Sequence, residues 1–166
     1  MANTYTQIYI QVVFAVSGRA NLLLPNHKEE LNKYITGIVS GQGQKLIAIN
    51  GMPDHIHLLV GLRPDIALSA LVREVKANSS KFINEKRWVR GRFCWQEGFG
   101  AFSYAHSQLG AVVKYIRNQE QHHTRKSFRD EYMTLLNKFD VAFERKYLFD
   151  FVDDSPGHAA PTGLGK

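Results

Sequence analysis

Residues 46–62, LIAINGMPDHIHLLVGL, contain two short apolar segments on either side of the sequence Gly51-Met52-Pro53-Asp54. Glycine, proline and aspartate are typical of tight turns, and short apolar segments bounded by such residues are typical of buried strands. We therefore predict strands over residues 46–50 and 55–62, paired antiparallel as a hairpin. The rest of the chain is interpreted outward from this hairpin.

The sequence before the hairpin predicts one strand and one helix. Residues 6–16 alternate between two faces, with Tyr9 and Gln11 on the polar one, as in a half-buried strand. After a loop, Asn26 and Glu29 have the spacing of a capping box, which marks the start of a helix. Apolar residues then follow at helical spacing: Leu31, Tyr34, Ile35, Ile38 and Val39.

The sequence after the hairpin completes the pattern. A helix follows Pro64, a fourth strand lies within residues 93–105, and further helices begin at Ser107 and span residues 127–139. The order strand, helix, strand, strand, helix, strand is that of the ferredoxin-like split βαβ plan. We predict an α+β fold: an antiparallel sheet with helices on one face and appended C-terminal helices.

The chain length predicts a single domain. Among 166 residues, we assign residues 1–152 to this domain. Residues 153–166 contain three glycines and two prolines without apolar periodicity, so we expect a disordered tail.

Composition limits the classes of protein that fit. No apolar stretch is long enough to span a bilayer and no secretory signal opens the chain, so we expect a cytoplasmic protein without membrane contact. Cys94 is the single cysteine, which excludes an internal disulfide and a multi-thiol zinc site. The net charge of +6 suits a polyanionic partner such as nucleic acid.

Two histidines in the predicted hairpin are candidate metal ligands. His55 and His57 share one face of their strand, opposite the apolar face that carries Ile56 and Leu58. Two imidazoles at this spacing can converge on one divalent ion. A pair of exposed strand histidines without a function fits the same pattern.

The helix after Ser107 carries a candidate nucleophile. At about 100° per residue, Tyr115 and Gln119 lie within about 40° of each other, beside the apolar stripe. A tyrosine there fits the edge of a core equally well, but Gln119 at i+4 could bring the phenol to a metal-bound phosphate. His122 falls on the Tyr115 side, where it could be a substitute metal ligand or a phosphate contact, and His123 falls on the apolar side. We interpret both as structural or solvated.

A basic segment containing aromatic residues is a candidate DNA contact. Cations that bind phosphates and rings that stack on bases are the components of single-strand binding, although a solvated helix face fits equally well. The basic residues are Arg73, Lys76, Lys81, Lys86, Arg87, Arg90 and Arg92, and the aromatic ones are Trp88, Phe93 and Trp95.

The sequence Pro53-Asp54-His55-Ile56-His57, followed by Tyr115 and Gln119 four residues apart, resembles the single-tyrosine HUH transposases of small bacterial insertion sequences. The resemblance covers residues 6–122 and includes both motifs in order. It implies a nuclease and ligase for single-stranded DNA that forms a 5′-phosphotyrosine intermediate. Tyr115 would be the nucleophile, and His55, His57 and Gln119 would hold Mg²⁺ or Mn²⁺.

The resemblance also implies partners. Similar proteins recognise hairpins at the ends of the mobile element, need no nucleotide cofactor and are dimers, so we expect a homodimer. Relatives associated with repetitive extragenic palindromes can act as monomers, and the role of residues 124–151 stays open.

Two alternatives remain at this stage. A non-catalytic nucleic-acid-binding module would stack bases on strand aromatics such as Tyr9, and would need neither Tyr115 nor a metal. A metal-dependent phosphodiesterase would use water and never become attached to DNA.

Overall fold

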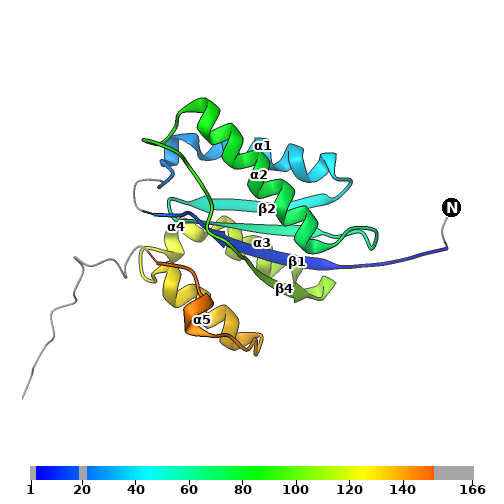
Figure 1. Ribbon diagram of the computed structural model, residues 1–166. Coiled ribbons are helices and arrows are strands. Elements are labelled where there is room, and N and C mark those ends of the chain that lie inside the picture. Colours follow the sequence, from blue (N-terminus) through cyan, green and yellow to red (C-terminus); the bar gives the residue numbers. More distant parts are fainter. Residues whose placement is uncertain (1–2, 19–21, 152–166) are drawn as a thin grey trace, which may run out of the picture.

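The computed structural model describes residues 3–18 and 22–151. Its centre is a four-stranded antiparallel sheet with the strand order β2-β3-β1-β4 (Figure 1). The strands are β1 (Tyr9–Ala15), β2 (Lys45–Met52), β3 (His55–Gly61) and β4 (Gly100–Tyr104). This order confirms the predicted α+β fold of the ferredoxin-like type.

Five α-helices and three short 3-10 helices are found in the described residues. The α-helices are α1 (Lys28–Gly41), α2 (Leu68–Lys86), α3 (Leu109–Arg117), α4 (Gln119–His122) and α5 (Phe128–Lys138). The 3-10 helices are η2 (Pro25–His27), η3 (His106–Gln108) and η4 (Arg145–Tyr147). No helix in residues 3–18 and 22–151 is long and apolar enough to cross a membrane. The predicted tail, residues 153–166, lies outside the described residues.

The predicted hairpin is confirmed, and its register places the two histidines. β2 and β3 pair so that Met52 lies opposite His55 and Asn50 opposite His57. β1 then pairs with the other edge of β3, with Val13 opposite His57. His57 is therefore in the middle of the sheet, between two neighbouring strands.

Helices cover both faces of the sheet, so the prediction of one covered face needs correction. α1 and α2 lie on one side of the sheet, and α3, α4 and α5 lie on the other (Figure 1). On the second side Ala48 and Leu59 pack against Val112 and Ile116 of α3. The apolar stripe of α3 covers the second face of β2 and β3, because no other surface is available to bury it.

Two local predictions are also wrong. The capping box at Asn26 and Glu29 does not form, because a 3-10 turn beginning at Pro25 leads into α1 and moves its N-cap to His27, which makes no side-chain cap. The helix expected to run unbroken past Gln119 ends at Arg117, and α4 begins two residues later.

The end of α3 is fixed by a side chain from the sheet. The buried Asn50 amide donates hydrogen bonds to the carbonyl oxygens of Ile116 (2.8 Å) and Arg117 (3.2 Å). These are carbonyls of the last helical turn, which need partners when a helix stops. The hairpin therefore fixes the position at which the chain turns from α3, with Tyr115, into α4, with Gln119.

Candidate active site

The two predicted histidines point to the side of the sheet that α3 and α5 cover. His55 and His57 are 1% and 0% exposed, so the interpretation as an exposed strand pair is wrong. The ring of His55 stacks on that of Phe128 of α5, with ring centroids 4.0 Å apart. Burying an imidazole is unfavourable unless its ring nitrogens form hydrogen bonds or ion pairs. The residues that contact these nitrogens therefore identify the site.

One carboxylate lies at the centre of these partners. Glu131 of α5 is 1% exposed, and its Oε1 lies 2.9 Å from His57 Nε2, 3.4 Å from His55 Nε2 and 3.1 Å from His123 Nε2. One ligating atom from each of these four residues lies within 4.8 Å of those of the others. Three imidazoles therefore converge on a single carboxylate oxygen.

The structure brings Tyr115 and Gln119 to the same place. The Tyr115 hydroxyl and the Gln119 Nε2 both donate to Glu131 Oε2, the latter at 2.9 Å. Gln119 Oε1 lies 3.3 Å from His55 Nε2 and 2.9 Å from His123 Nε2. The four residues selected from the sequence, on β3, α3 and α4, thus form one cluster around Glu131.

Outer contacts fix the orientation of the two strand imidazoles. Asp54 Oδ1, in the hairpin turn, is 2.7 Å from His55 Nδ1. The amide nitrogen of the buried Gln11 is 2.9 Å from His57 Nδ1, and the Tyr104 hydroxyl donates to Gln11 Oε1 at 2.7 Å. Because each imidazole is held at Nδ1, its Nε2 is directed at the cluster. The acceptor opposite His55 Nδ1 is the kind of outer partner that metal-ligating histidines have, whereas His57 Nδ1 faces an amide donor.

The charges in the cluster are strongly coupled. Burial disfavours a charged imidazole, but the hydrogen bonds and charges of Asp54 and Glu131 outweigh it and raise the pKa of His55 to about 9. Burial lowers the pKa of His57 despite the neighbouring Glu131. Burial alone would raise the pKa of Glu131, but hydrogen bonds to His123, His55 and His57 hold it well below its ordinary value. The carboxylate is therefore ionised.

The same environment keeps the phenol protonated. Burial, together with the negative charge of Glu131, raises the pKa of the Tyr115 hydroxyl above its ordinary value. Positive charge close to Glu131 and Tyr115 would oppose this effect, because it would favour the phenolate.

The donor atoms in the cluster fit a divalent metal. Neutral imidazole nitrogens, a carboxylate oxygen and the Gln119 amide oxygen are all common metal ligands, and the three Nε2 atoms already converge on one point. The predicted metal ligands His55, His57 and Gln119 belong to this set.

A groove open to solvent leads to Tyr115. It has a volume of about 410 Å³ and lies between α3 and α5, with Tyr115, His122 and Glu131 along its wall. Lys126 and Lys138 also line it. A polyanion in this groove would therefore contact positive charge beside the Tyr115 hydroxyl.

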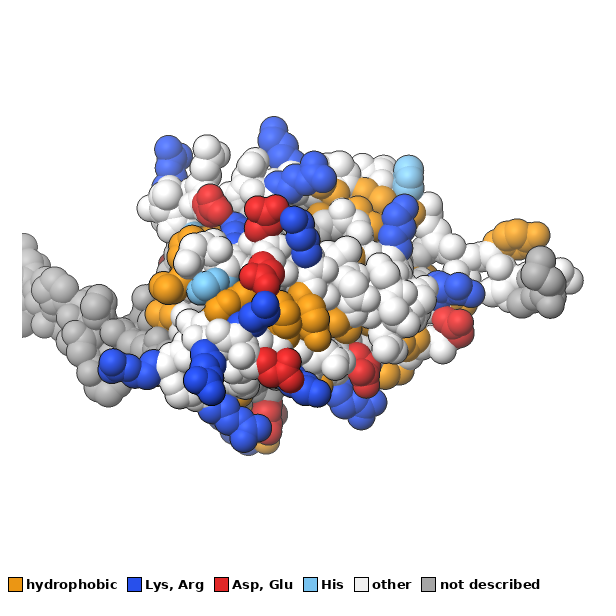
Figure 2. All heavy atoms as spheres, turned by 90° about the horizontal axis from the view of Figure 1, so that it is seen from above, with side chains coloured by type: hydrophobic (Ala, Val, Ile, Leu, Met, Phe, Trp, Pro, Cys, Tyr) orange, Lys and Arg blue, Asp and Glu red, His pale blue; other side chains and the backbone are white. Residues whose placement is uncertain are grey.

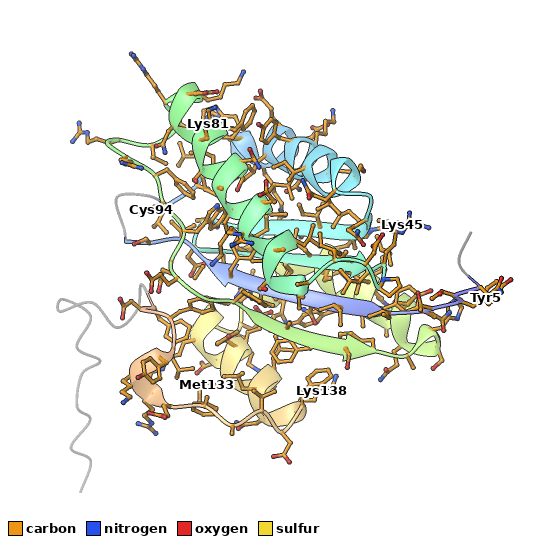
Figure 3. All side chains as sticks on the ribbon, turned by 45° about the vertical axis from the view of Figure 1, so that its right-hand side comes forward. Tyr5, Lys45, Lys81, Cys94, Met133 and Lys138 are labelled. Carbon is orange, nitrogen blue, oxygen red and sulfur yellow. The ribbon has the colours of Figure 1, made fainter. Side chains whose placement is uncertain are left out.

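The basic segment lies on the other side of the sheet. Lys81 on α2 and Lys138 on α5 are on opposite sides in Figure 3, and Figure 2 shows Lys and Arg side chains interspersed with acidic ones on the α1/α2 side. The Lys76 ammonium donates to the carbonyl oxygens of Gln96 (2.8 Å) and Gly98. The segment is thus separated by the sheet from Tyr115.

The aromatic residues of that segment do not form a stacking surface for bases. Phe93 and Trp95 are buried in the core, where the Trp95 indole donates to Ser79 Oγ at 2.9 Å. Trp88 is stacked on His27, with centroids 4.4 Å apart. The prediction of base-stacking rings is wrong because these apolar side chains are needed to close the core beneath α2.

The sequence interpretation missed two members of the cluster, and the sequence contained a signal for both. Glu131 falls on the buried stripe of α5, between Phe128 and Leu135, where a carboxylate is unfavourable without partners. His123 was placed toward the apolar side of its helix but interpreted as structural. A charged residue on an apolar stripe and a histidine facing the core together indicated a buried polar site.

Comparisons with known proteins identify relatives of this chain. The model of the IS200-like transposase family matches residues 4–119, which is more than half of the chain. The ISDra2 transposase TnpA from Deinococcus radiodurans is 24% identical over 120 residues, which cover 68% of this chain and 84% of the relative.

Two solved structures share the fold. A protein from Deinococcus radiodurans R1 described as a candidate transposase superposes with a TM-score of 0.56, at 21% identity, over 72% of this chain and 95% of its own. A REP-associated tyrosine transposase bound to a REP hairpin also has a TM-score of 0.56, at 18% identity, over 74% of this chain and 73% of its own. With the family match over residues 4–119, these findings show that the chain belongs to the IS200-like transposase family and is a DNA strand transferase of single-stranded DNA transposition.

Proposed function

We propose that Tyr115 is the nucleophile of this strand transferase. Its oxygen attacks the phosphorus of a DNA phosphodiester, the bond to the 3′ oxygen breaks, and a 5′-phosphotyrosyl ester and a 3′-hydroxyl result, with the phenolic proton transferred overall to that oxygen. Because the ester retains the energy of the broken bond, a second 3′-hydroxyl can attack it and reseal the strand. The observation that carries the proposal is the contact of the Tyr115 hydroxyl with the buried cluster of His55, His57 and Gln119 through Glu131.

The proposed cofactor is a divalent ion, Mg²⁺ or Mn²⁺, held by His55, His57 and Gln119. When bound, it supplies positive charge to the phosphate oxygens. Asp54 and Gln11 hold the imidazoles in place, and the covered sheet face limits the access of water.

We propose that Tyr115 acts within its own subunit. The hydroxyl, both strand histidines and Gln119 already meet in one chain, so no partner residue is needed to complete the site. Mixing Tyr115→Phe and His57→Ala proteins tests this. The mixture stays inactive if each site uses its own tyrosine, and regains activity if the tyrosine comes from a partner. The homodimer itself stays a prediction.

The proposed substrate is a single strand beside a hairpin, as in the hairpin complex of the structural neighbour. The groove between α3 and α5 leads to Tyr115 and carries Lys126 and Lys138, so we assign the cleaved strand to it. The basic segment, including Arg73, Lys81, Arg87, Arg90 and Arg92, lies on the far side of the sheet. It can bind the hairpin but not the phosphate that is cut.

The non-catalytic binding module is less well supported. Stacking bases on a sheet requires an open sheet face, whereas α1 and α2 cover one face of this sheet and α3 covers much of the other. A hydrolase that uses water would not require a tyrosine in contact with the cluster.

The test is to incubate the full chain with labelled single-stranded DNA carrying the hairpin and flanks from beside its gene, with Mg²⁺ or Mn²⁺. A denaturing protein gel should show a metal-dependent adduct that Tyr115→Phe does not form. Tight binding without an adduct under either metal would favour the binding module. Free cleaved DNA without an adduct would favour the hydrolase.

A further inference from the structure

Residues beyond the end of the family match contribute side chains to the buried cluster. The match ends at Gln119, whereas His123 follows α4 and Glu131 lies on α5. Glu131 Oε1 nevertheless lies as close to His57 Nε2 (2.9 Å) as it does to His123 Nε2 (3.1 Å). The segment thus supplies as many groups to the cluster as β3 does.

We propose that His123 and Glu131 are ligands of the same divalent ion as His55 and His57, so that the segment from α4 to α5 completes the metal site. The proposal rests on the metal dependence of the proposed function. It adds two metal ligands from a part of the chain that the family match does not cover. Through Glu131, it also gives residues 124–151 a role.

The geometry supports ligation by both residues. The four donor atoms lie within 4.8 Å of one another, and the three imidazole nitrogens surround one carboxylate oxygen. His123 Nδ1 is held at 2.7 Å by the Lys126 carbonyl oxygen, so its Nε2 is directed at the cluster as those of His55 and His57 are. His55 and His123 each face an acceptor oxygen at Nδ1, which is the outer-partner arrangement that metal sites use, whereas His57 Nδ1 faces the Gln11 amide nitrogen.

The rival explanation is a purely structural ion-pair cluster that docks α5 on the sheet. A buried carboxylate among imidazoles is costly to desolvate, and apolar residues of the same size would dock a helix at least as well. The neighbours of Glu131 on α5, Phe128, Tyr132 and Leu135, already supply an apolar docking surface. Docking alone therefore does not require Glu131.

The types of ligand atom at this site predict which metal ion it prefers. Mg²⁺ prefers oxygen ligands and retains water, whereas imidazole nitrogens suit transition metals. A site with three imidazoles, one carboxylate and the Gln119 amide oxygen should bind Mn²⁺ and Co²⁺ more tightly than Mg²⁺.

The experiment is a calorimetric titration of the full chain with Mn²⁺ and Co²⁺, repeated with His123→Ala and Glu131→Gln. Asp130→Asn and His106→Ala are matched controls, because they change an adjacent exposed carboxylate and an exposed histidine. We expect the affinity to fall at least about 10-fold in the two test variants and to stay unchanged in the controls. Wild-type affinity and an unchanged Co²⁺ absorption spectrum in both test variants would overturn the proposal.

A second measurement needs no variant and so does not depend on how well the variants fold. Histidine side-chain nitrogen spectra of the wild-type chain, recorded during a Zn²⁺ titration, should show the imidazoles of His55, His57 and His123 shifting together. Shifts confined to His55 and His57 would contradict ligation by His123. Tyr115→Phe removes a hydrogen bond to Glu131 Oε2 but no ligand, so it should still bind the metal. Loss of the DNA adduct at saturating metal would therefore test the nucleophile separately from the ligands.

Discussion

The two faces of β3 perform different tasks with alternating residues of one strand. Ile56, Leu58 and Val60 face α1 and α2 and are almost fully buried in an apolar core. His55 and His57 face the opposite side and are equally buried, but their partners are Glu131, Asp54 and Gln11. The first face contributes stability, whereas the second places costly polar groups where the chemistry requires them.

The helices that cover the two faces differ in the same way. The buried residues of α2 are apolar except for Ser79, whereas the buried stripe of α5 contains the ionised Glu131. This difference between the two helices is consistent with a structural role for the first face and with the proposed functional role for the second.

The largest effect is expected from the polar face. His57→Ala should reduce cleavage below detection, because it removes a metal ligand, while binding of the hairpin continues. The measurement is a cleavage assay beside a gel-shift titration with the same DNA. His106→Ala, which changes an exposed histidine, should cleave normally. Full cleavage by His57→Ala would refute the metal assignment.

Leu58→Ala changes the apolar face of the same strand. Because Leu58 is buried in the core, the substitution should lower the free energy of unfolding by about 2–5 kcal/mol. Urea unfolding measures this, and the folded fraction should retain wild-type metal affinity. A loss of metal affinity in the folded protein would show that the two faces are not independent.

Gly100→Ala tests the position of α5. A Cβ at Gly100 would lie 2.7 Å from Tyr132 Cε2 and from its hydroxyl oxygen, and the ring is confined by Phe128 and Phe149. We expect a loss of about 1–3 kcal/mol in unfolding free energy, together with weaker Mn²⁺ binding, because α5 carries Glu131. Gly110→Ala, where a Cβ meets nothing within 4 Å, is the control. Equal unfolding curves for the two variants would contradict the prediction.

The smallest effect is expected from the exposed basic segment. Arg90→Ala and Arg92→Ala should each weaken hairpin binding modestly and reduce the slope of log K against log salt by about 1, because each removes a cation that we propose to contact a phosphate. Cleavage at saturating DNA should not change, since the segment is separated from Tyr115 by the sheet. Lower cleavage at saturation would place these residues near the cut strand.

Much of the fold and of the candidate site could be predicted from the sequence, because local patterns of residues specify them. Strand alternation placed His55 and His57 on one face, and the spacing of four residues brought Tyr115 and Gln119 together, although the helix between them breaks at Asn118. The burial of the histidines could not be predicted, because it depends on α3 and α5 folding back over the second face. The contact between Glu131 and His57 spans 74 residues, which local periodicity does not specify.

The most direct test of the account is to identify the residue that becomes attached to DNA. After reaction with Mn²⁺, the adduct is digested with nuclease and trypsin, and the modified peptide is sequenced by mass spectrometry. The account predicts a nucleotide phosphate on Tyr115 alone. Attachment to another residue, such as Tyr104 or Tyr132, or an unmodified protein with fully cleaved DNA, would contradict it.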